Sequence, residues 1–280
     1  MKSLLFSALL LLTLSSSAQY YYKDMVGTKE SSDLIKTYMK NKVSRVMLTS
    51  YDADNTKSDN LFVQQEFSPT KRVLKTVTAT GANNGNMSTL FTYADENGNI
   101  IKTVDSTGVV VNTTTYSYDA AGNLTLVNIS SSDTTINESE QHIWQWENGK
   151  PLKMLRVKNK KDTVHVDFKL DENGNVSEET ETRQRTTSRP YYYYYNENNQ
   201  LTDVVRYNDR AKQLLPEYMF EYSASNQVIQ KITVPSNNSD YLIWRYQYNP
   251  QGLKTKEVVY SKHDKRNPMG KIEYQYSFVQ

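Results

Sequence analysis

The sequence predicts an all-β protein built from antiparallel hairpins, and three observations support this fold class. Turn residues recur every 24 to 27 positions between Gly98 and Gly252. Aromatic and polar residues alternate before most of these turns, which is the period-2 pattern of a half-buried strand. An aliphatic residue follows each turn and begins a return strand. A fixed period of about this length is typical of a repeated supersecondary unit.

The clearest copy of the repeat is Tyr116–Leu124, which reads as strand, tight turn and strand. In each unit, two residues on alternate positions face inward, and the residue between them faces solvent. The predicted inward pairs are Phe91 and Tyr93, Tyr116 and Tyr118, Trp144 and Trp146, Phe168 and Leu170, Tyr193 and Tyr195, Phe220 and Tyr222, and Tyr246 and Tyr248. The chain has 22 Tyr and 7 Phe. Tyr suits such a strand because its ring is buried while its hydroxyl stays hydrated.

Neighbouring hairpins are expected to pair edge to edge, because a lone hairpin is marginally stable in water. Seven hairpins and the earlier strands exceed the roughly 10 strands at which a twisted open sheet curls. We therefore expect an antiparallel meander of about 24–27-residue β-hairpin repeats, curled into a spiral, a partial shell or an irregular barrel. A β-propeller is the competing architecture, but seven units make only three to four blades, at or below the usual minimum.

One short N-terminal amphipathic helix is predicted at about residues 32–42, and it is expected to plug one end of the rolled sheet. The preceding Tyr20, Tyr21 and Tyr22 belong to a lead-in that we expect to be exposed. Strands are predicted at 43–51, 61–67 and 73–78 before the clear repeats begin. The predicted parts of the chain are a signal peptide (1–18), a lead-in with the helix (19–45) and a β-hairpin repeat domain (46–280).

The first residues have the pattern of an export signal. Lys2 precedes an apolar run from Leu4 to Leu14, and small residues then lead to Ala18. Cleavage after Ala18 would release a chain with no transmembrane segment into the periplasm or the exterior, since roughly 20 apolar residues are needed to span a bilayer. The chain contains no Cys. It therefore cannot be a lipoprotein anchored through Cys, form disulfides or bind zinc through thiolates.

Residues 116–124 resemble the YD repeat of the RHS family, in which Tyr-Asp and a downstream Gly recur in long β-hairpin arrays. Residues 222–226 and 248–253 resemble weaker copies, so the likeness extends over about residues 90–280. In RHS proteins, the core ends in Asp-Pro-x-Gly-Leu with a self-cleaving Asp, but the matching residue here is Asn249. The resemblance therefore implies hairpin repeats without self-cleavage. The chain is also similar to small exported Bacteroidota proteins of unknown function.

Catalytic and metal-binding patterns are weak, so no catalytic residue, metal ligand or cofactor is assigned. His142, His165 and His263 fall in different units without ligand spacing. The segments 95–99 and 171–175 look like calcium loops but lack the distal Glu, and turn chemistry explains them better. Nucleophile and nucleotide-binding motifs are missing from the sequence. A glycosidase stays open as an alternative, because its two carboxylates need not be close in sequence.

The charge balance is nearly even, with 33 basic and 31 acidic residues. A nucleic acid or acidic lipid partner would require a concentrated basic face, so neither is expected. The expected partner is an unknown protein or a glycan.

The repeat pattern is broken at residues 190–195, where Tyr192 and Tyr194 fall on the outward face. Together with nearby Arg183, Arg185 and Arg189, they are the candidate binding residues, because exposed aromatic rings stack on sugars or proteins. We also expect Tyr20–Tyr22 to contribute to this surface. The leading hypothesis is a non-enzymatic, exported interaction or structural module of the cell envelope or exterior. The alternatives are a glycan-binding module that uses the exposed tyrosines and, less favoured, an envelope hydrolase.

Overall fold

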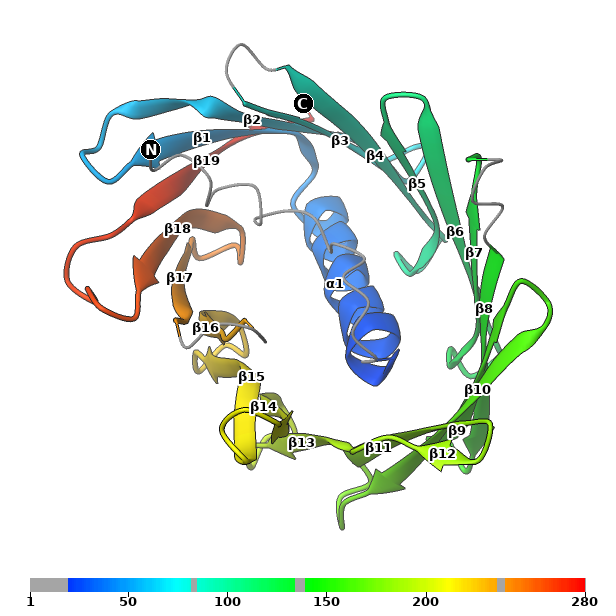
Figure 1. The fold of residues 1–280 in the computed structure, drawn as a ribbon. Coiled ribbons are helices and arrows are strands. Elements are labelled where there is room, and N and C mark those ends of the chain that lie inside the picture. Colours follow the sequence, from blue (N-terminus) through cyan, green and yellow to red (C-terminus); the bar gives the residue numbers. More distant parts are fainter. Residues whose placement is uncertain (1–19, 82–84, 134–138, 236–239, 280) are drawn as a thin grey trace.

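The computed structural model describes residues 20–81, 85–133, 139–235 and 240–279, so the predicted signal peptide lies outside the described residues. The described chain is one all-β body with a single helical segment (Figure 1). The strands are β1 (Val43–Asp52), β2 (Lys57–Ser68), β3 (Val73–Thr80), β4 (Asn86–Ala94), β5 (Ile100–Thr107), β6 (Val110–Tyr118), β7 (Leu124–Ser131), β8 (Ser139–Glu147), β9 (Lys150–Lys158), β10 (Asp162–Leu170), β11 (Val176–Arg183), β12 (Thr186–Thr187), β13 (Tyr191–Tyr195), β14 (Leu201–Asn208), β15 (Gln213–Tyr222), β16 (Val228–Thr233), β17 (Leu242–Tyr248), β18 (Lys254–Ser261) and β19 (Gly270–Phe278).

The strands form a closed antiparallel barrel. Each long strand pairs with its sequence neighbours, while the two-residue β12 pairs with β11 beside the β11–β13 contact. The last strand, β19, returns to β1, with Val43 opposite Phe278 and Asp52 opposite Gly270. The result is an 18-strand barrel, in which red β19 lies beside blue β1 (Figure 1). The meander and barrel predictions are confirmed, and the spiral and partial shell are wrong because the two terminal edges satisfy each other's backbone groups.

The helical segment lies inside the ring of strands (Figure 1). It begins with a π-helical turn, η2 (Tyr21–Val26), and continues as α1 (Gly27–Lys40), so it starts earlier than the predicted 32–42. Tyr20 and Tyr22 are only 5% and 6% exposed. The prediction of an exposed lead-in is therefore wrong, because these rings fill space between the helix and the inner wall.

The helix crosses the barrel at the end that carries the short hairpin turns. Ser32 Oγ accepts a hydrogen bond from the Ile100 backbone N–H, directly after the turn at 95–99. Lys36 donates to Asn99 Oδ1 in the same turn. Asn41, just beyond α1, donates to the Gln251 carbonyl in the turn at 249–253. These contacts support the expectation that the helix closes one end of the sheet.

Most repeats are tied to the previous one by an aromatic side chain at the second inward position, whereas Ala94 and Leu170 occupy this position without a donor. The strand pairing shifts by one residue at the second inward position of the hairpins, for example between Ser117 and Tyr118 and between Glu221 and Tyr222. The side chain at this position donates to the first carbonyl of the previous return strand. These bonds are Tyr118 to Ile100, Trp146 to Leu124, Tyr195 to Val176, Tyr222 to Leu201, Tyr248 to Val228 and Tyr276 to Lys254. The hydroxyls at these positions therefore bond to the backbone, which differs from the predicted hydration.

The first clear hairpin departs from the predicted inward pair. Thr92 and Ala94 are buried on the inner face, so Phe91 and Tyr93 lie on the outer face. Counting back from the turn glycine, Ala94 occupies the place that Tyr118 fills in the next unit. A small residue fits here because Ala94 belongs to the core cluster formed by the helix and β1.

The hydroxyl bonds should contribute measurably to stability. Tyr222→Phe leaves the Leu201 carbonyl without its 2.7 Å partner, so we expect a loss of about 1 kcal/mol in the free energy of unfolding. Urea unfolding measures this loss. Tyr194→Phe on the outer wall is the control, with an expected change within about 0.5 kcal/mol. Equal effects of the two substitutions would contradict the structural role of the hydroxyl.

Gly98 should be less tolerant of substitution than Gly122. Both have positive φ values, of 79° and 84°, so backbone strain is matched. A Cβ on Gly98 would lie 2.7 Å from Lys36 Cγ of α1, whereas nothing lies within 4 Å of one on Gly122. We expect Gly98→Ala to lower the melting temperature more than Gly122→Ala by scanning calorimetry. If the two variants melt together, α1 does not pack on this turn as described.

Candidate functional site

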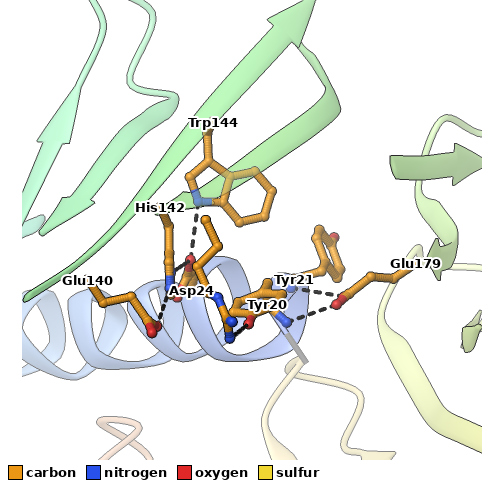
Figure 2. A network of polar contacts seen from close by, with 8 residues as sticks. Tyr20, Tyr21, Asp24, Glu140, His142, Trp144 and Glu179 are labelled. Carbon is orange, nitrogen blue, oxygen red and sulfur yellow. Dashed lines mark hydrogen bonds and ion pairs between the residues drawn. The ribbon is translucent and has the colours of Figure 1, made fainter. Parts of the chain in front are cut away.

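A connected group of buried polar side chains joins the helical segment to β8 (Figure 2). His142 is fully buried, and its Nδ1 lies 2.6 Å from Asp24 Oδ2 of η2. Its Nε2 lies 2.8 Å from Glu140 Oε1. Trp144 Nε1 donates to the same Asp24 oxygen at 3.2 Å. Asp24 is thereby held between two side chains of one strand.

His142 is doubly protonated in this arrangement. A neutral imidazole has one N–H group, so a ring that donates to two ionised carboxylates must carry both protons. Burial lowers the pKa of His142, but Asp24 and Glu140 outweigh that effect and raise the pKa to about 9. The hydrogen bond from His142 in turn holds the pKa of Glu140 below its usual value. The ring is therefore a fixed cation at neutral pH.

Glu179 of β11, three strands along the wall from β8, caps the start of the helical segment. Its two carboxylate oxygens accept the backbone N–H groups of Tyr20 and Tyr21 at 3.0 and 3.1 Å (Figure 2). The Tyr193 hydroxyl donates to the same carboxylate at 2.6 Å. Burial raises the pKa of Glu179 to about 7, although these hydrogen bonds favour the ionised form. An acceptor at this position satisfies amides that a helix cannot satisfy itself.

A second group of charges lies further along the helix. Glu30 of α1 is exposed to solvent, yet desolvation inside the ring of strands raises its pKa, and the positive charges of Lys231 and Lys254 on the wall oppose that shift. Lys231 donates to the Tyr22 hydroxyl at 3.2 Å and lies 5.0 Å above the Tyr218 ring. The bonds of Asp24 to His142 and Trp144, and of Lys231 to the Tyr22 hydroxyl, hold the helical segment against the wall at two places. These contacts help to fix the position of the helix in the barrel.

The polar interior is therefore built to hold the helical segment. Its hydrogen bonds run between the helix and the wall, and His142 is fixed between carboxylates with no nucleophile bonded to it. Sequence reasoning missed this network, since His142 has no ligand spacing and was given no role. The partners are 118 and 159 residues apart for the Asp24–His142 and Tyr20–Glu179 contacts. The one sequence signal in this strand was the alternation of His142, Trp144 and Trp146, which places His142 on the inward face of β8.

The remaining sequence candidates have local roles. His165 is exposed on β10, and His263 pairs with Asp240 at 2.8 Å. In the calcium-like turn at 95–99, Asp95 Oδ1 accepts the backbone N–H groups of Asn97 and Asn99. These bonds support the interpretation as turn chemistry. In the part of the chain that the structure describes, no three His, Cys, Asp or Glu residues are grouped to hold a metal ion.

The structure places the predicted tyrosines on the outer wall. Tyr194 of β13 is 49% exposed, and Tyr192 is half-buried. The predicted contribution of Tyr20–Tyr22 to this surface is wrong, because Tyr20 and Tyr22 are buried inside the barrel.

The three arginines lie at the other end of the same hairpin. Arg183 pairs with Asp162, and Arg185 is exposed at the turn. Arg189 pairs with Asp209 and stacks 3.9 Å from the Tyr207 ring centroid. The chain advances about 17 Å between Arg189 and Tyr194 if each strand residue adds about 3.4 Å. The structure therefore does not bring these arginines and Tyr194 into one compact patch.

Tyr194 instead begins a row of side chains that crosses the outer wall. The register places Tyr194 opposite Asp203, Asp203 opposite Met219, and Met219 opposite Ile232. Ile232 lies opposite Ile243, which lies opposite Tyr260. We call these six residues the outer-wall row. Five of the six are apolar or aromatic. Tyr194 is exposed, Ile243 is buried, and the other four are half-buried. The row was not predictable from one strand, because each strand contributes a single residue.

The comparisons with known proteins concern the repeat and the fold. Residues 94–133 match the profile of the RHS Repeat family, which confirms the resemblance for that stretch. No curated protein sequence matches. Within the described residues, no helix combines the length and apolar character needed to cross a bilayer.

Several solved structures align with this chain, with low sequence identity and low TM-scores. A porin-like protein from Bacteroides uniformis is 8% identical, with a TM-score of 0.41 over 84% of this chain and 98% of that chain. A TcdB2-TccC3-Cdc42 structure is 15% identical, with a TM-score of 0.34 over 76% of this chain. A Photorhabdus luminescens Tc holotoxin pore is 15% identical, with a TM-score of 0.33 over 76% of this chain. This chain spans only 12% of each of the latter two.

Stability should fall on the alkaline side because of His142. Its pKa is raised from 6.5 to about 9 in the folded state, so its contribution is complete below pH 6.5 and is lost as the pH rises through 9. The contribution is on the order of 3 kcal/mol at most. In urea unfolding between pH 6 and 10, we expect His142→Gln to be less stable at pH 6 and to have a flatter pH profile. Parallel profiles of the variant and the wild type would contradict the double protonation.

Proposed function

We propose that this chain is a non-enzymatic, exported β-repeat module of the cell envelope or exterior that binds a partner through its outer-wall row. The observation that carries this proposal is the position of the row on the outside of a closed barrel. The row joins the exposed ring of Tyr194 to the half-buried side chains of Met219, Ile232 and Tyr260. Apolar side chains that continue across several strands of an outer surface are typical of interaction sites. The titratable groups that are buried around the helix meanwhile serve to hold it, which favours a binding role over catalysis.

A glycan-binding module is the second candidate, and Tyr194 favours it. Its ring is about half exposed, and Tyr192 lies on the same outer face of β13. Two rings on one strand face offer a platform on which sugar rings stack, with their hydroxyls within reach of neighbouring polar side chains. This candidate uses one end of the outer-wall row, whereas a protein partner uses its whole length.

The outer-wall row is tested by capture from envelope extracts of the producing organism. Met219→Glu places a charge in the middle of the row, and Val104→Glu is a matched control on the outer face of β5. We expect the wild type and Val104→Glu to recover the same partner, and Met219→Glu to recover at least about tenfold less, which corresponds to roughly 1.4 kcal/mol of binding free energy. Near-identical melting temperatures establish that both variants are folded. Equal recovery by all three proteins would reject the row as the interface.

Export and sugar binding are checked separately. N-terminal sequencing of protein from the producing cells is expected to begin at Gln19, and a retained residue 1 would reject the export proposal. On a glycan array, the glycan alternative predicts binding that is lost in the double variant Tyr192→Ala/Tyr194→Ala. Binding that survives this double substitution, or no binding by the wild type, would reject the tyrosine platform.

A further inference from the structure

The barrel separates charges that nearly cancel in the sequence. Consecutive antiparallel strands place alternate connections at opposite ends, so the short turns at 95–99, 119–123, 171–175 and 196–200 share one end. The connections at 159–161, 184–190, 209–212 and 262–269 lie together at the other end. We call these four connections the basic rim. Its cations are Lys160, Lys161, Arg185, Arg189, Arg210, Lys212, Lys262, Lys265 and Arg266.

Acidic side chains near the basic rim are already engaged. Asp209 pairs with Arg189, and Asp240 pairs with His263. The Asp264 carboxylate accepts the backbone N–H groups of Arg266 and Asn267, and these bonds lower its pKa. Three acids against nine cations leave this arc, from β9 to β19, with a clear positive excess.

At the opposite end of the barrel, the short turns are acidic, and two of them lie between β9 and β14, directly across from the basic rim. The four short turns named above contain no Lys or Arg. They carry Asp95, Glu96, Asp119, Asp171, Glu172 and Glu197. Lys71 and Arg72 lie at this acidic end too, but in the β2–β3 connection, away from these four turns. Between β9 and β14 the positive excess is therefore confined to one end, and the total charge of +2 conceals it.

Aromatic rings lie among the cations of the basic rim. The Arg189 guanidinium stacks on Tyr207. Tyr241 has Lys262 and Lys265 at 5.9 and 5.8 Å from its ring centroid. Tyr207 and Tyr241 are each half-buried, so part of each ring is open to solvent. A ring with a cation beside it suits a ligand that has both a stacking face and an anionic group.

We infer that the basic rim binds an acidic polysaccharide, whose carboxylate or sulfate groups pair with the cations while its sugar rings stack on Tyr207 and Tyr241. Successive hairpins are about 10 Å apart, since adjacent strands are separated by about 4.8 Å. The cations therefore come in groups with gaps between them. Duplex DNA carries one charge per about 1.7 Å, whereas a uronate chain carries isolated charges on separate sugars. The spacing on the rim favours the sparser polymer.

This inference names a ligand class for the proposed interaction module and rests on that function, but it uses a different surface. The test compares full-length mature protein with two triple variants of equal charge change. The rim variant is Lys212→Gln/Lys262→Gln/Lys265→Gln. The control variant is Lys71→Gln/Lys75→Gln/Lys102→Gln, whose lysines lie at or near the β2–β3, β3 and β5 segments. Near-identical melting temperatures show that both variants are folded.

The probes are polygalacturonate, dextran sulfate and neutral dextran, with a 20-base-pair DNA duplex and phosphatidylglycerol vesicles as competing polyanions. By titration calorimetry, the wild type is expected to bind polygalacturonate or dextran sulfate, and not dextran, with an affinity that falls between about 50 and 200 mM salt. The rim variant should bind at least about tenfold more weakly, and the control variant within about twofold of the wild type. Comparing the two polysaccharides shows whether carboxylate or sulfate is preferred.

Four outcomes would overturn the inference. They are no polysaccharide binding by the wild type, equal losses in the two triple variants, tighter binding of DNA or vesicles, and self-association through the rim without polysaccharide binding. Met219→Glu distinguishes this failure from that of the outer-wall proposal. It is expected to bind polysaccharide like the wild type, so capture through the wall and binding at the rim can fail independently.

Discussion

The hydrogen bond from an aromatic side chain to the carbonyl of the preceding repeat is the interaction on which the barrel wall depends. The bulge beside each turn shifts the strand pairing and places a backbone carbonyl on the inner face, where an unpaired acceptor would be costly. The Tyr118, Tyr195, Tyr222 and Tyr248 hydroxyls satisfy these carbonyls from the next hairpin. Because each bond crosses between repeats, it fixes the distance and twist from one hairpin to the next. Phe would supply the ring without this bond, which explains the preference for Tyr.

The number of strands creates the second constraint. Barrels of 16 to 18 strands enclose more space than their own inward side chains can fill. The helical segment fills part of this space, and its polar contacts determine how it sits. Glu179 caps its first amides, and Asp24 bonds to His142. These buried charged groups are costly to remove from water, so their main effect is to specify one position of the helix among many with similar apolar contact. The wall and the helix therefore depend on each other.

The sequence was sufficient for the repeat because its determinants are local. Asp95, Asp119 and Asp171 bond to the backbone of their own turns, so turn positions and the meander follow from spacing. The inward assignment of Tyr93 was wrong because aromatic identity was given more weight than distance from the turn glycine. The sequence could not decide between a closed barrel and a spiral or partial shell, since closure requires β1 and β19 to meet after every intervening twist has accumulated. The helix network was equally hidden, because Asp24 and His142 have no local relation.

Net charge was the least informative sequence property, for a topological reason. In an antiparallel meander, alternate connections lie at opposite ends, so residues about 25 positions apart gather at one end while the intervening connections gather at the other. A sequence with balanced charges can therefore fold into a molecule with a strong axial asymmetry. Here the connections between β9 and β19 are rich in Lys and Arg, and the turns between β4 and β14 are rich in Asp and Glu. The net charge of a repeat barrel should accordingly be calculated separately for the connections at each end. A charged partner that approaches one end meets the charges of that end, and not the total charge of the chain.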